Sequence, residues 1–270
     1  KISGITKMKK NIIKIAKEVV KMETTSLKKL EANIGKSFEQ IIKTIINCKN
    51  GKIIISGVGK SGIIGKKWSA TLSSTGTPSF FLDASNASHG DMGQITSNDI
   101  LILISLSGQS EELKNIIQYT SRNKNIKLIG ITSKKDSLLY KNSDLKFLLP
   151  SVKEAGPGNI VPTSSTTVQV ALGDAIAITC MVYKKFGKLD FKKFHPSGSL
   201  SIKLKTVEDL MLSGKKIPFV NENVSMKDAL VSITKKNLGT LVIKNNRDYT
   251  TGILTDGDLK RINNIKLSFK

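Results

Sequence analysis

The sequence predicts an α/β protein in which a doubly wound, parallel five-stranded sheet is followed by a small C-terminal α+β module. Two observations support the sheet. Short apolar runs rich in isoleucine and leucine alternate with helical segments, and glycine-rich or hydroxyl-rich turns follow two of these runs. Such alternation is typical of a parallel sheet with helices on both faces. With 270 residues, the chain is long enough for one such domain and a smaller second unit.

The elements of the first domain are expected in a simple order. Residues 8–48 have apolar positions at helical spacing, interrupted at Gly35, which predicts two helices ahead of the sheet. The five predicted strands cover residues 53–56, 79–82, 100–105, 127–132 and 145–149. A long helix is expected over 167–186, and a less regular stretch over 189–205.

The last part of the chain is expected to form a unit of its own. From Thr206 the pattern predicts a helix, an extended segment, a helix over 226–236, two strands and a final short helix. The two strands, 240–243 and 252–255, flank a polar turn at Asn245–Asp248. We therefore divide the chain into a first domain, 1–205, and a C-terminal module, 206–270.

Composition narrows the class of partner. The formal net charge is +22, and lysine supplies nearly all of the positive charge, because arginine occurs only at 122, 247 and 261. Arginine is the residue suited to bidentate contacts with phosphates and bases. We interpret the charge as a solvated lysine surface and expect no nucleic-acid partner.

The location of the protein is also suggested by composition. No apolar run approaches the ~20 residues that a membrane-spanning helix needs, so no membrane partner is expected. The first residues lack the apolar core and cleavage site of a secretory signal. Cys48 and Cys180 stand in apolar helical contexts, which favours buried, reduced thiols. We expect a cytoplasmic protein.

A glycine-rich turn follows the first predicted strand. Gly57, Gly59 and Gly62 satisfy the pattern G-x-G-x-x-G between a strand and a helix, which dinucleotide-binding proteins share. A nicotinamide-dependent oxidoreductase is therefore one alternative. The glycines, however, only let a phosphate approach a helix N-terminus, so a sugar phosphate suits the turn equally well. Its candidate binding residues are Gly59, Lys60 and Ser61.

Two further helices are predicted to start from hydroxyl-rich turns. Their hydroxyl residues are Ser105, Ser107, Ser110, Thr163, Ser164, Ser165 and Thr166. Any one of these alone is best explained as a helix cap. In a doubly wound sheet, however, the carboxyl ends of the strands share one edge, so the three helix starts can converge. Together they predict a phosphate-binding cradle.

The motifs along the chain resemble those of a known family. GVGKSG, STGTPSFF, ASHGDMG, ISLSGQSEE, EAGPGNIVPTSSTT, GDA and HPSGSL occur in order from residue 57 to residue 200. This series is similar to that of arabinose-5-phosphate isomerases, which combine a sugar isomerase (SIS) domain with C-terminal CBS modules. The resemblance extends from the first helices to about residue 260.

The resemblance implies an aldose–ketose isomerase. The reaction would interconvert D-ribulose 5-phosphate and D-arabinose 5-phosphate, without a cofactor, and would feed synthesis of the lipopolysaccharide sugar Kdo. It needs a base that moves a proton between C1 and C2, and donors for the oxyanion of the enediol. The residues carried over are catalytic Lys60, Glu154 and His195, with Gly76, Thr77 and His89 lining the sugar site. Which of Glu154 and His195 abstracts the proton is left open.

The sequence also departs from the family pattern. Gln109 stands where the family has a catalytically relevant glutamate, and an amide cannot exchange a proton in the working pH range. Asp83 replaces a histidine implicated in metal binding, so no metal site is expected. These changes leave a second alternative open, a catalytically impaired sugar-phosphate sensor.

The C-terminal module resembles a single CBS motif. In that family the T-x-x-D segment, here Thr255 to Asp258, can contact a nucleotide, so a nucleotide is a candidate ligand. CBS motifs work in pairs, and one is recognised before Lys270. The resemblance also implies a homotetramer, because SIS proteins commonly place the crevice at a subunit interface.

Overall fold

The computed structural model describes the backbone of residues 2–194 and 205–263, and the side chains of 11–194 and 205–261. The chain separates into two compact units, Lys1–Leu204 and Lys205–Lys270, called here the first and second units. The HPSG segment, with His195, lies outside the described residues.

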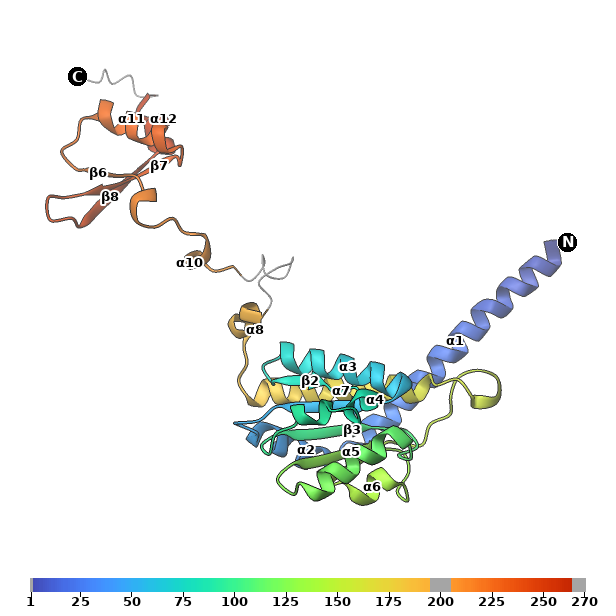
Figure 1. Cartoon of the computed structure of the whole chain (residues 1–270). Helices are drawn as coiled ribbons and strands as arrows, with labels where there is room; N and C mark the ends of the chain where they lie inside the picture. The colour runs from blue at the N-terminus through green and yellow to red at the C-terminus, as the bar shows by residue number, and fades with distance from the viewer. Residues whose placement is uncertain (1, 195–204, 264–270) are drawn as a thin grey trace. The chain divides into compact units, whose positions relative to one another are not determined.

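Helices and strands alternate through the first unit (Figure 1). Its helices are α1 (Ile2–Asn33), α2 (Lys36–Asn47), α3 (Gly59–Ser74), α4 (Ala84–Ala87), α5 (Glu111–Arg122), α6 (Leu138–Asn142), α7 (Ser164–Tyr183) and α8 (Lys188–Phe194), with 3-10 turns η1 (Asp91–Gln94) and η2 (Pro157–Asn159). Its strands are β1 (Ile53–Gly57), β2 (Ser79–Phe81), β3 (Ile100–Ile104), β4 (Lys127–Thr132) and β5 (Leu145–Leu148).

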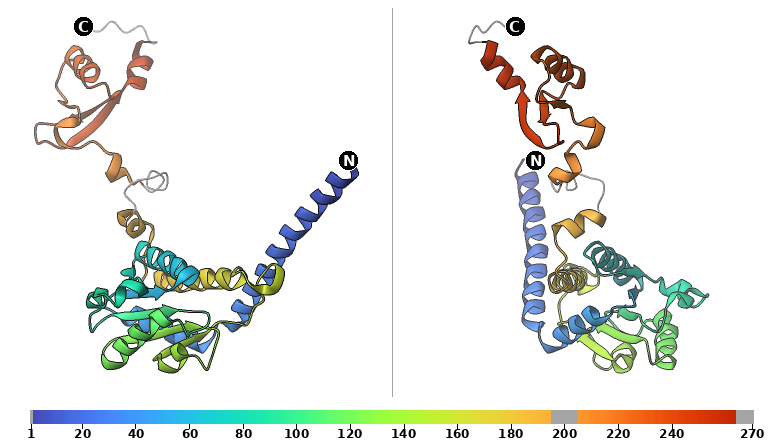
Figure 2. Two further views of the ribbon diagram at one scale, coloured as in Figure 1. Left: turned by 45° about the vertical axis from the view of Figure 1, so that its right-hand side comes forward. Right: turned by 90° about the vertical axis from the view of Figure 1, so that its left-hand side faces the viewer.

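The five strands form one parallel sheet in the order β2-β1-β3-β4-β5, which confirms the predicted fold class. Successive side chains of a strand point to opposite faces. On β1, Ile53 and Ile55 join one apolar cluster with α2, α3 and α7, whereas Ile54 joins a second cluster with α5. Both faces of the sheet are therefore covered by helices (Figures 1 and 2).

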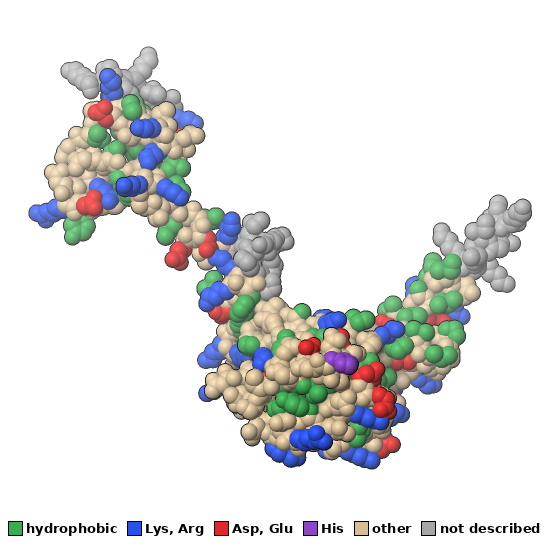
Figure 3. Space-filling view, in the orientation of Figure 1, with side chains coloured by type: hydrophobic (Ala, Val, Ile, Leu, Met, Phe, Trp, Pro, Cys, Tyr) green, Lys and Arg blue, Asp and Glu red, His purple; other side chains and the backbone are tan. Residues whose placement is uncertain are grey.

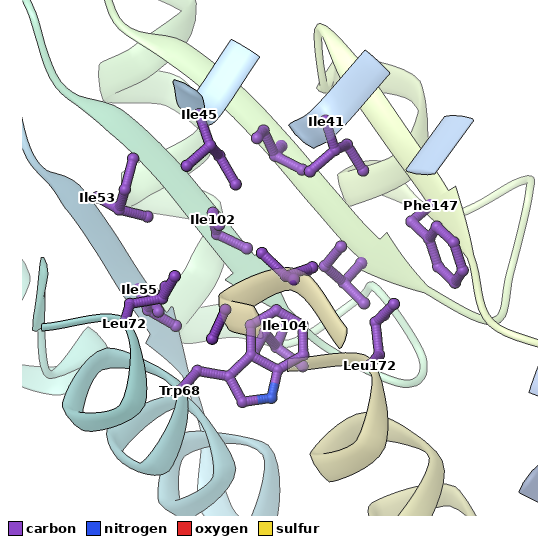
Figure 4. Packing of buried hydrophobic residues seen from close by; sticks show 14 of the residues in the cluster. Ile41, Ile45, Ile53, Ile55, Trp68, Leu72, Ile102, Ile104, Phe147 and Leu172 are labelled. Atoms are coloured by element: carbon purple, nitrogen blue, oxygen red, sulfur yellow. The ribbon is translucent and has the colours of Figure 1, made fainter. Parts of the chain in front are cut away.

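One large side chain sets the packing of α3 against α7. Trp68 is fully buried and lies with Ile104 and Leu172 in the first cluster (Figure 4). Its indole Nε1 donates a hydrogen bond to the backbone oxygen of Gln169 at 2.9 Å. A Cβ atom at Gly173 would collide with the same indole. The close approach of the two helices therefore depends on a tryptophan on α3 and a glycine on α7.

Two predicted bounds were wrong. Helix α7 starts at Ser164, three residues earlier than predicted, because the Glu154 carboxylate accepts the N–H groups at its start. The helix ends before Lys185, because that residue has a φ of 54°, in the left-handed region. Residues 188–194 form α8 where an irregular stretch was expected, and the Asp190 carboxylate accepts the N–H of Gly187 at 3.1 Å there. The early start of α7 and the presence of α8 come from side-chain hydrogen bonds that apolar periodicity does not register.

The long helix α7 is a core element. It is the one helix among the described residues whose length and composition would allow it to cross a membrane. Its Leu172, Ile176 and Ala177 pack into the first cluster, which accounts for its apolar composition. Cys180, on the same helix, is buried and free, and burial raises its pKa to about 11. Cys48 is also a free thiol but only half-buried.

Charged side chains are spread over the visible face of each unit. Figure 3 shows lysine and arginine side chains scattered among neutral and apolar surface rather than gathered in one patch. This distribution agrees with a solvated lysine surface. The absence of a nucleic-acid partner stays a prediction.

The second unit is small. Its elements are α10 (Val207–Leu210), η3 (Gly214–Lys216), β6 (Phe219–Asn221), α11 (Met226–Lys236), β7 (Thr240–Lys244), β8 (Thr250–Thr255) and α12 (Asp256–Asn263). Strand β7 pairs parallel with β6 and antiparallel with β8. Its core cluster contains Ala229, Ile233 and Leu241. At the start of α12, the Asp258 carboxylate accepts both the N–H and the hydroxyl of Thr255, at 2.9 and 2.6 Å. The T-x-x-D segment thus caps its own helix.

Candidate functional site

The glycine-rich turn joins β1 to α3 at the carboxyl edge of the sheet. Gly59 has a φ of 58°, in the left-handed region that glycine adopts without strain. A Cβ atom at Gly62 would lie 2.6 Å from the backbone oxygen of Gly57, so the turn has no room for a side chain there. Lys60 is exposed, and the described residues give it no hydrogen-bond or ion-pair partner. The turn therefore presents a helix N-terminus and a free ammonium group.

The serine-rich turn joins β3 to α5. Ser105 is buried, and its hydroxyl accepts the N–H of Gly108 and contacts the hydroxyl of Ser110, both at 3.1 Å. Ser107 and Gln109 are exposed, and the Gln109 N–H donates to the Ser107 hydroxyl at 3.3 Å. Gly108 has a φ of 64°, and a Cβ there would collide with the Ser137 side chain. One buried serine thus holds the turn while a second faces solvent.

The third helix start is that of α7, and Glu154 is bound to it. The Oε2 atom of Glu154 accepts the N–H of Thr163 at 2.8 Å, the Thr163 hydroxyl at 3.1 Å and the N–H of Ser165 at 3.2 Å. Burial would raise the pKa of Glu154, but the hydrogen bonds from Ser165 and Thr163 outweigh it and hold the pKa below its ordinary value. Glu154 is therefore ionised at neutral pH.

The packing of the helices brings the three starts to one edge. Trp68, in the middle of α3, contacts Gln169 in the first part of α7, and Lys184, just after α7, donates to Thr77, just beyond the end of α3. The two helices therefore run in the same direction. Because β1 and β3 are neighbours in a parallel sheet, the turns that follow them also lie side by side. The carboxyl edge of the sheet therefore holds all three helix starts: the glycine-rich turn, the serine-rich turn and the start of α7.

Other predicted site residues lie elsewhere within one chain. Gly76 and Thr77 precede β2 and thus lie at the amino edge, opposite the three helix starts. Thr77 is buried and accepts a hydrogen bond from Lys184 Nζ at 2.9 Å. A single chain does not join these two residues to the site. His89 is exposed between α4 and η1, and His195 lies outside the described residues.

The structure adds a residue that motif reasoning missed. A crevice of about 120 Å³ lies beside the glycine turn, lined by Gly57, Gly59, Gly62, Lys66, Asp83 and Ser85 among others. Lys66 lies four residues after Gly62 and therefore on the same face of α3, a spacing visible in the sequence. Asp83 accepts the N–H of Ser85 at 2.9 Å and so caps α4. Among the described residues, no cluster of three His, Cys, Asp or Glu side chains could hold a metal ion.

Comparisons with known proteins agree with this geometry. The SIS domain family model matches residues 45–179. Arabinose 5-phosphate isomerase KdsD of Francisella tularensis is 43% identical over 251 residues, which cover 92% of this chain and 76% of that protein. KdsD of Escherichia coli K12 is 41% identical over 247 residues, covering 91% and 75%.

A solved structure is also similar to this chain. An Escherichia coli CFT073 protein, c3406, solved in complex with arabinose 5-phosphate, is 37% identical and superposes with a TM-score of 0.64. The match covers 69% of this chain and 98% of that one. The order of the strands, the helix starts at one edge of the sheet and the similarity to these relatives all indicate the same family. This chain belongs to the family of SIS-domain arabinose 5-phosphate isomerases and is, at that level, a sugar-phosphate isomerase.

Proposed function

We propose that this protein interconverts D-ribulose 5-phosphate and D-arabinose 5-phosphate without a cofactor, and that the product feeds Kdo and lipopolysaccharide synthesis in the cytoplasm. The observation that carries the proposal is the serine turn beside the glycine turn. Their strands β1 and β3 are neighbours, but α3 and α5 cover opposite faces of the sheet. This is the switch point at which doubly wound sheets bind ligands.

The phosphate group is assigned to this switch point. The first N–H groups of α3 and α5 have no acceptor within their own helices, and helix N-termini attract anions. Ser107 and Ser61 supply hydroxyls there, and the exposed ammonium of Lys60 supplies positive charge. Two acidic residues, Glu111 and Glu112, follow in the first turn of α5, and Glu111 pairs with Lys114 at 2.6 Å. The serine hydroxyls and the α3 start therefore carry most of the binding.

The chemistry requires movement of protons only. A base removes a proton from C1 of the ketose, the enediol forms, and a proton is returned at C2, while the hydroxyl proton of O1 is lost and O2 gains one. Lys60 is suited to stabilising the negative oxygen of the enediolate. Glu154 and His195 are the residues that the family resemblance assigns to proton transfer.

One observation favours the sensor as a second candidate. Gln109 occupies the exposed position just before α5, next to the phosphate-binding turn, and it can donate or accept a hydrogen bond but not a proton. A chain that binds the phosphosugar and turns it over slowly would fit this position. The homotetramer and a nucleotide ligand of the second unit also stay proposals.

The experiment is a direct assay. Purified protein incubated with ribulose 5-phosphate should form arabinose 5-phosphate, resolved by NMR, and pentose 5-phosphates should raise the melting temperature more than NAD or NADP do. Ser107→Ala should raise KM about 10–100-fold, because it removes a hydrogen bond to a charged group. Ser97→Ala, an exposed serine at the amino edge, is the matched control. Stabilisation by NAD alone would favour the oxidoreductase.

A further inference from the structure

The chain between β5 and α7 is fastened at one point. The N–H of Ala155 donates to the Thr163 hydroxyl at 2.8 Å, and that hydroxyl donates to Glu154 Oε2 at 3.1 Å. These two bonds join residues eight and nine positions apart and close the base of a loop over 156–162. All seven loop residues are exposed. Ordering such a loop costs conformational entropy, which the bonds at its base offset.

The same carboxylate also caps α7. Glu154 Oε2 accepts the N–H groups of Thr163 and Ser165, two of the donors that the helix start leaves unpaired. Neither Thr163 nor another side chain within α7 provides the cap locally. The position of the third helix start therefore depends on a residue outside the helix. A negative group at a helix N-terminus is also favoured by the helix dipole.

These contacts restrict the chemistry that Glu154 can perform. Its Oε2 atom already accepts three hydrogen bonds, and hydrogen bonding from Ser165 and Thr163 outweighs burial and holds the pKa of Glu154 below its ordinary value. A carboxylate with a low pKa is a weak base, and it is not protonated at neutral pH to act as an acid. Oε1 accepts no bond from the described residues and is the one oxygen left for a substrate.

We propose that Glu154 is a positioning residue: it ties the base of the 156–162 loop to the first turn of α7 and so places that turn at the site, while another group carries the proton. The statement that another group carries the proton rests on the proposed function. The positioning part concerns the folded chain and is measurable without turnover.

The test compares Glu154→Ala and Glu154→Gln in the full chain. In Glu154→Ala, amide exchange at Thr163 and Ser165 should accelerate at least about 10-fold, and KM for ribulose 5-phosphate should rise about 10–100-fold, since charged hydrogen bonds are lost. Glutamine keeps an acceptor oxygen, so Glu154→Gln should restore exchange and KM to within about 5-fold of native. The pH profile of kcat/KM should keep its acidic limb in both variants. Glu31→Gln, an exposed glutamate on α1, is the control.

The opposite outcomes are distinct. A loss of kcat by about 10²–10⁴-fold in Glu154→Gln with KM unchanged, and disappearance of the acidic limb, would show that Glu154 moves the proton and overturn the proposal. Unchanged amide exchange in Glu154→Ala would overturn it as well. If the native chain has no isomerase activity, the proposed function fails instead, while exchange and the calorimetric affinity for arabinose 5-phosphate still decide the positioning role.

Discussion

The two units use the same hydrogen-bonding device over different distances along the chain. In the second unit, Asp258 accepts the N–H and hydroxyl of Thr255, three residues away, and caps α12. In the first unit, Glu154 accepts the N–H and hydroxyl of Thr163, nine residues away, and joins a loop to α7. The short bond stabilises one helix end. The long one controls where a helix start lies relative to the site.

The cores of the two units differ in size. The first unit buries both faces of the central strands of its sheet, with Trp68 and Phe147 among its fully buried side chains. The core cluster of the second unit has three buried residues, Ala229 and Ile233 on α11 and Leu241 on β7. A small core leaves little stability in reserve. Chemistry that needs fixed geometry is therefore expected in the first unit.

The largest expected effect concerns the site alone. Gln109→Glu should raise kcat about 10²–10⁴-fold with KM roughly constant, because one positioned acid or base contributes that much. The added carboxylate precedes the start of α5, where the helix dipole favours negative charge, and Lys114 already pairs with the neighbouring Glu111. Steady-state kinetics measure the change. Phosphosugar binding without turnover in both forms would support the sensor.

Leu241→Ala should affect the second unit. It truncates one of the three buried side chains of the core cluster of that unit, and such truncations cost about 2–5 kcal/mol. We expect the second unit to unfold separately, seen as lost helical circular dichroism. Trp68, the single tryptophan, reports the first unit, and its fluorescence transition should stay unchanged. A shift of both transitions together would show that the units are not independent.

Gly173→Ala should destabilise the first unit by about 1–3 kcal/mol, because the added methyl group overpacks the contact between α7 and Trp68. The fluorescence midpoint in urea should fall, while the second unit keeps its stability. Gly93→Ala is the matched control, since nothing lies within 4 Å of a Cβ there. Equal effects from the two substitutions would contradict the role of Gly173.

The smallest of these effects is expected from Asp99, and it appears in how the stability of the first unit depends on acidification. Burial would raise its pKa, but N–H groups of Thr96 and Lys52 and the Lys52 ammonium lower it overall. A lowered pKa stabilises the fold above about pH 4, and that stability is lost as pH falls through the folded-state pKa. Asp99→Asn should flatten the acid dependence of the first unit. An unchanged acid midpoint would exclude Asp99 as its source.

Much of this protein follows from local sequence pattern. The isoleucine runs at 53–56 and 100–105 predict buried parallel strands, and the glycine and serine turns after them predict a site at their carboxyl ends. These signals lie within a few residues of each other, where period and turn chemistry are expressed directly. The assignment of the three helix starts to one edge needed only the rule that parallel strands end together.

Packing in three dimensions governs which groups meet. No local pattern shows that Trp68 requires a glycine at 173, or that Glu154 accepts the unpaired N–H groups at the start of α7. Each of these depends on contacts between distant segments, whose formation is governed by packing of the whole sheet and its helices. Local pattern was enough to predict the fold and the edge at which the three helix starts lie, whereas the packing of α7 brings its first N–H groups to Glu154.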